Sequence, residues 1–166
     1  MRSLFRTELK IKSCLDAAGI RNFLPTKDSV SESYGRKVCV KVPVISNLIF
    51  VYSNPAELAP IMSENSRFQF IYKRGGRENE SIVVPDREME DFIKAVENSS
   101  KPLYFPPGEL NMSKGTRIRI IGGLLDGMEG IFLKVKGARS RRLVVEIPGM
   151  IAVAVEVEPD LVQILA

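Results

Sequence analysis

The sequence predicts an α+β protein of two domains, in which an N-terminal α/β sandwich precedes a C-terminal five-stranded β-barrel of the SH3-like kind. Over residues 1–98, short β-rich runs alternate with helical patterns, which is typical of a sheet with helices packed on it. Residues 99–113 contain three prolines and no apolar period, as expected for a linker between domains. Residues 114–166 hold five short β-rich runs, and a closed barrel leaves such strands no exposed edge.

The first domain is expected to combine three helical segments with several strands. An apolar stripe at helical spacing predicts a helix over residues 7–18, Asn54-Pro55 opens a short helix, and Asp86 caps a longer one. Residues 37–42 alternate valine with lysine or cysteine, which predicts a half-buried strand with a basic outer face. Further expected elements are a short strand over residues 20–25, a central strand over residues 48–52 and a hairpin that turns at Gly75-Gly76.

Four glycines within residues 122–130 precede the second run of the barrel. A phosphate-binding loop of the P-loop type needs Gly-Lys-Ser/Thr leading into a helix, whereas here the chain leads into Ile-Phe-Leu, which is β-rich. The glycines are therefore interpreted as residues that let the backbone adopt tight turns. Gly122 and Gly123 would allow a turn with positive φ, and Gly127 and Gly130 would let the chain double back tightly.

Composition narrows the function classes. The net charge of +4 permits an acidic partner but does not require one. Histidine is absent and only two cysteines are present, so neither a catalytic triad nor a metal site is expected, and no cofactor is expected either. The sequence has no apolar run long enough to cross a membrane and no signal peptide, and its two cysteines suit a reducing cytoplasm. Without histidine a non-enzymatic protein is expected, although an enzyme that uses Asp, Glu, Lys or Tyr stays an alternative.

Residues 114–135, KGTRIRIIGGLLDGMEGIFLKV, resemble a KOW motif, and residues 6–26 and 35–51 resemble the first helix and central hairpin of the NusG N-terminal domain. The chain thus resembles the NusG family of bacterial transcription elongation factors over nearly its whole length, which implies a ferredoxin-like or RNP-like sheet followed by a KOW barrel. PVISNLIFV, IVVPDREMEDFI and KVKGARSRR are similar to the UpxY-type paralogs, which antiterminate polysaccharide operons.

The resemblance implies that the first domain binds RNA polymerase and modulates pausing or termination. Ile45 and Leu48 stand where the family has its exposed contact residues, although Ile45 could instead tuck under the sheet. Met1-Arg2 stands where the family's first strand would end, so either the sequence begins late or the sheet lacks a strand. The uncovered edge would allow dimerisation of a protein that is otherwise expected to be a monomer.

Two further surfaces are expected from the resemblance. Leu125 and Met128, in the glycine turn, would contact Rho or a small-subunit ribosomal protein, unless they belong to the core. Basic side chains would contact the backbone of DNA or RNA, or simply be solvated. The runner-up function is a KOW-bearing, ribosome-associated RNA-binding protein. The basic candidates are Arg36, Lys37, Lys41, Arg139, Arg141 and Arg142.

Overall fold

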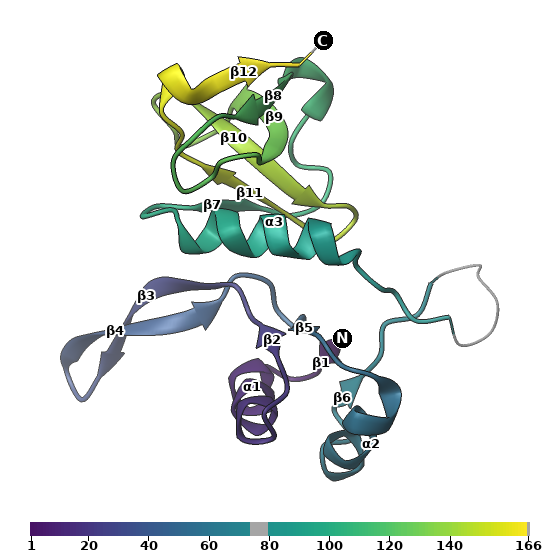
Figure 1. The fold of residues 1–166 in the computed structure, drawn as a ribbon. Coiled ribbons are helices and arrows are strands. Elements are labelled where there is room, and N and C mark those ends of the chain that lie inside the picture. Colours follow the sequence, from purple (N-terminus) through teal and green to yellow (C-terminus); the bar gives the residue numbers. More distant parts are fainter. Residues whose placement is uncertain (74–79, 166) are drawn as a thin grey trace. The chain divides into compact units, whose positions relative to one another are not determined.

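The computed structural model describes residues 1–73 and 80–165, and the chain divides into two compact units, Met1–Val83 and Val84–Ala166 (Figure 1). This division differs from the predicted linker at residues 99–113. Helix α3 (Asp86–Glu97), which was predicted to belong to the first domain, packs on strands of the second unit. Part of the expected linker is itself a strand, β7 (Leu103–Phe105), which pairs with a strand of the second unit. The predicted turn at Gly75-Gly76 lies outside the described residues.

The first unit has a βαββαβ order with a long hairpin inserted in its middle. Its helices begin near the predicted positions, and the Asn54 side chain accepts a hydrogen bond from the Glu57 N–H at the start of the second one. Its elements are β1 (Arg2–Ser3), α1 (Glu8–Ala17), β2 (Asn22–Phe23), β3 (Thr26–Ser33), β4 (Arg36–Pro43), β5 (Phe50–Val51), α2 (Pro55–Glu64) and β6 (Phe68–Gln69).

The short strands of this unit line up in the order β6, β1, β5, β2. Strand β1 pairs antiparallel with β6, Arg2 bridges Leu48 just before β5, and β5 pairs antiparallel with β2. This is the order of a split βαβ arrangement. One apolar cluster draws on both helices and the sheet, and it consists of Ile11, Leu15, Leu24, Ile49, Leu58, Ile61 and Phe68.

The place at which a first strand was expected to be missing is occupied by the short strand β1. Strand β1 lies between β6 and the segment before β5. The Met1 amino group donates to the Ile49 carbonyl at 2.8 Å, and the Ile49 N–H donates to the Met1 carbonyl at 3.1 Å. The short strand β1 thus lies between β6 and the segment before β5, and its backbone groups find hydrogen-bond partners on both of these neighbours.

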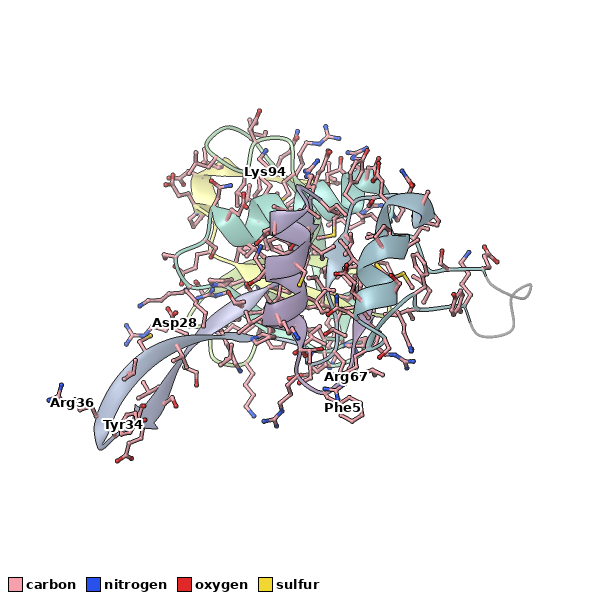
Figure 2. The ribbon with its side chains drawn as sticks, turned by 90° about the horizontal axis from the view of Figure 1, so that it is seen from below. Phe5, Asp28, Tyr34, Arg36, Arg67 and Lys94 are labelled. Atoms are coloured by element: carbon pink, nitrogen blue, oxygen red, sulfur yellow. The ribbon has the colours of Figure 1, made fainter. Side chains whose placement is uncertain are left out.

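Strands β3 and β4 form a hairpin with eight paired positions (Figure 2). Its turn has Tyr34 at φ 51° and Gly35 at φ 72°, the positive values that a two-residue hairpin turn of type I′ requires. The expected half-buried strand over residues 37–42 is instead largely exposed at its tip end, where Val38 is an exposed valine. Strand β3 was not predicted, because its serines give no apolar alternation.

The second unit is one sheet with the strand order β12-β8-β9-β10-β11-β7 (Figure 1). The five predicted runs are all strands and β7 adds a sixth, so a six-stranded sheet stands where a five-stranded barrel was expected. Helix α3 packs against β10 and β11. The remaining elements are η1 (Met112–Lys114), β8 (Thr116–Ile120), β9 (Glu129–Lys134), β10 (Arg141–Ile147), β11 (Ile151–Val155), η2 (Pro159–Leu161) and β12 (Val162–Ile164).

Candidate functional site

The loop between β4 and β5 carries the two residues predicted to lie at a docking surface. Ile45 is half-buried and therefore offers part of its side chain to the surface. Leu48 is only 8% exposed and directly precedes the buried Ile49. Of this pair, only Ile45 is in a position to touch another molecule without local rearrangement.

Two hydrogen bonds to Asn47 hold this loop in place. The carboxylate of Glu8, which is buried at the start of α1, accepts a hydrogen bond of 2.5 Å from the Asn47 N–H. The Asn47 carbonyl accepts from the Ser3 N–H at 3.2 Å. Asn47 itself has φ 65°, a conformation that asparagine tolerates better than most residues. The loop is thus fixed on both sides, which limits the conformations open to Ile45.

An exposed aromatic side chain, Phe5, lies beside Arg67 (Figure 2) and follows β1, whose Ser3 is bonded to this loop. Phe5 is 75% exposed and has φ 59°, and the guanidinium carbon of Arg67 lies 5.1 Å from the centre of its ring. The Leu4 N–H donates to the Arg67 carbonyl at 2.9 Å, next to the bond that joins Ser3 to Asn47. We call Phe5, Ile45 and Arg67 the apolar loop end. Phe5 was not predicted to lie at a surface, because an aromatic residue before a helix is ordinarily a packing residue.

The three basic residues of β4 are exposed, but two of them face acids. Lys41 forms an ion pair of 2.8 Å with Asp28, and this contact raises the pKa of Lys41. Lys37 is paired in register with Glu32, whereas Arg36 stands opposite the uncharged Ser33. The expected basic face is therefore largely neutralised by β3, a strand that the sequence pattern does not reveal.

The glycine turn of the second unit has the geometry that the sequence predicts. Gly122, Gly123 and Gly127 have φ values of 83°, 70° and 76°. At Gly130 a side chain has no room, because a Cβ atom would lie 2.5 Å from the Val144 carbonyl oxygen. Gly130 thus permits the close approach of β9 to β10.

The two residues expected to bind a partner protein from this turn are buried instead. Leu125 and Met128 are buried in the second unit, which agrees with the alternative expectation that they are core residues. The exposed apolar residues in this region are Ile121, just after β8, and Leu124, which is 73% exposed. Adjacent leucines in a loop carry no signal of which one points inward, so the sequence could not separate the exposed Leu124 from the buried Leu125.

The basic loop between β9 and β10 separates into two kinds of residue. Arg139 and Arg141 are exposed, as expected for contact with a polyanion. Arg142, however, is 5% exposed, and its guanidinium donates to the Lys101 carbonyl at 2.7 Å and to the Glu156 carboxylate at 2.5 Å. The assignment of Arg142 to nucleic-acid binding is therefore corrected, since its charged group is used within the fold.

Within residues 1–73 and 80–165, the structure has no group of three or more side chains placed to hold a metal ion. No helix among the described residues is long and apolar enough to span a membrane. The fold and these surfaces define a two-unit α+β protein with an exposed apolar end on one unit and a group of exposed cations on the other.

Comparison with known proteins finds a likeness among solved structures. No protein-family model matches the chain, and no curated protein matches it in sequence. The chain is similar in structure to NusG from Thermotoga maritima, in a structure reported as "Domain interaction in Thermotoga maritima NusG". The TM-score is 0.48 and the identity 19%, over 98% of this chain and 93% of that one.

Proposed function

We propose that the protein is a NusG-type regulator of transcription elongation, which binds RNA polymerase through the apolar loop end of its first unit. In this proposal the first unit corresponds to the NusG N-terminal domain and the second to a KOW barrel. The observation that carries the proposal is a surface loop that contains the half-buried Ile45 and whose Asn47 N–H is bonded to the buried Glu8. The sequence resemblance supplies the nature of the partner.

The physical support for docking is preorganisation. A protein interface concentrates its binding energy in a few apolar or aromatic residues near its centre, and arginine is enriched beside them. The apolar loop end offers this combination, with Phe5 under the Arg67 guanidinium and Ile45 on the neighbouring loop. Because hydrogen bonds already order the loop, little conformational entropy is lost on binding.

The second unit would recruit Rho or a small-subunit ribosomal protein. Ile121 and Leu124 are the exposed apolar residues available for such a contact, in place of the buried Leu125 and Met128. The protein would act without catalysis, by holding two partners on one chain and so raising their effective concentration. Control of polysaccharide operons by antitermination, in the bacterial cytoplasm, is the finer form of this proposal and is based on the UpxY-like features.

The test is the affinity of the purified chain for core RNA polymerase. Ile45→Asp places a charge in the centre of the proposed contact, and we expect the affinity to fall by at least about 30-fold, the loss typical of a hot-spot residue. Val30→Asp is the matched control, because Val30 is an exposed valine on the hairpin, and it should leave the affinity unchanged. Equal affinity of wild type and Ile45→Asp would refute the docking surface. Protection of ribosomal RNA with no polymerase binding would favour the runner-up function.

A further inference from the structure

A cleft of about 450 Å³ lies wholly within the second unit. One wall is the chain from Phe105 to Lys114, and the other is the end of β9 with the start of β10. The floor is apolar, because Phe105, Leu133 and Val135 belong to the buried cluster beneath it and Leu110 packs against that cluster. This volume falls within the range of roughly 300–1,000 Å³ that small-molecule sites occupy.

The rim of this cleft is strongly cationic. Lys114, Lys134, Lys136 and Arg141 line it, and Glu109 is its one acid. The second unit as a whole is not basic, since residues 84–166 contain eleven Lys and Arg against twelve Asp and Glu. The positive charge is therefore concentrated at the cleft, and such concentration attracts anions.

These cations are not neutralised within the part of the chain that the structure describes. Lys134 and Arg141 occupy directly paired positions on β9 and β10, where like charges destabilise a sheet. The Lys134 ammonium donates to the Arg139 carbonyl, which leaves its charge uncompensated. Among the described residues, the ion pairs of this unit involve Arg117, Arg119 and Arg142 but none of the four rim cations.

We propose that this cleft binds a nucleotide, with the phosphate held by Lys114, Lys136 and Arg141 and the base lying over the apolar floor. Lysine and arginine both bind phosphate through charge-assisted hydrogen bonds. Strands β9 and β10 are each paired on both sides, so they offer no free edge to an extended acidic peptide, which commonly binds by adding a strand. The nucleotide is either free or one unit of a single strand, and these two sources share the same chemistry. The cleft does not depend on polymerase docking, which is assigned to the other unit.

The test measures binding of two probes to the full chain, a mononucleotide (uridine monophosphate) and a fluorescein-labelled single-stranded hexauridylate. Binding of either probe supports the proposal, and the tighter one identifies the source. We expect Lys114→Ala, Lys136→Ala and Arg141→Ala each to weaken binding by roughly 3- to 10-fold. For the hexamer, log K should fall with log salt at a slope of about −2 for three cations, and each substitution should reduce this slope by about 0.7.

Two controls keep the result specific. Arg117→Ala removes an exposed arginine of the same unit that does not line the cleft, and it should bind as wild type does. Ile45→Asp should also bind the hexamer normally, which separates this inference from the proposed function. Unchanged affinity in all three cleft variants, or equally tight binding of hexaglutamate, would overturn the assignment. Thermal unfolding of each variant confirms that loss of binding is not loss of fold.

Discussion

The neighbouring residues Arg141 and Arg142 offer a sharp test of the structure, because they look alike in the sequence. Arg142→Ala removes a side chain that is 5% exposed and donates to the Lys101 and Ala154 carbonyls and to Glu156. A hydrogen bond from a charged group contributes about 1.5–3 kcal/mol. The Glu156 carboxylate is largely exposed and regains water, so most of the loss comes from the Lys101 carbonyl and from packing. We expect the free energy of unfolding to fall by about 3 kcal/mol.

The assay is urea unfolding followed by circular dichroism, with Tm measured in parallel. For a body the size of the second unit, about 3 kcal/mol corresponds to a fall in Tm of roughly 12–24 °C. Arg141→Ala is the matched control, and as an exposed substitution it should stay within about 0.5 kcal/mol of wild type. Arg142→Met should recover part of the loss, because it keeps the apolar volume without a buried charge. If Arg142→Ala costs no more than Arg141→Ala, the buried role of Arg142 is wrong.

Three other predictions follow from buried groups. Gly130→Ala should lower the free energy of unfolding by about 1–3 kcal/mol through overpacking, measured by urea titration, and a loss below about 0.5 kcal/mol would contradict this. Glu8→Ala should cost about 2 kcal/mol, because the Asn47 N–H loses a charged acceptor, and unchanged proteolysis of the loop would argue against that role. Burial lowers the pKa of the Met1 amino group from 8.0 to about 6, so the unfolded chain binds more protons between these values. The free energy of unfolding should therefore rise by at most about 2.7 kcal/mol as the pH rises across this window. Acetylation of the N-terminus should abolish this rise. The chain has no histidine whose titration would overlap with it.

Strong local periodicity allowed much of the fold to be predicted. The helices over residues 8–17 and 86–97 and the five runs of the second unit have apolar patterns that a helix or strand must bury, and all of them form. Strand β3 was missed, because Ser29 and Ser31 pair with valines of β4, Ser33 pairs with Arg36, and these serines give no apolar pattern of their own. An exposed hairpin is fixed by its turn and by backbone pairing, and neither leaves a strong signal in this stretch of sequence.

The boundary between units and the roles of single residues depend on tertiary contacts. Helix α3 has the same amphipathic pattern whichever sheet it packs on, so its sequence could not assign it to the second unit. Tertiary contacts also make adjacent residues differ in exposure: Leu124 is exposed, whereas Leu125 is buried. The cationic cleft combines residues 105–114 with residues 133–141, and the prolines of the first segment predict a linker rather than the wall of a site.

The decisive experiment for the proposed function is single-round transcription by purified core RNA polymerase with and without the chain. We predict that the wild-type protein changes pause lifetimes or readthrough at a terminator, that Ile45→Asp does not, and that Val30→Asp behaves as wild type does. A saturating concentration of the wild-type chain that leaves elongation unchanged would contradict the proposed function, and so would an effect that Ile45→Asp fully retains.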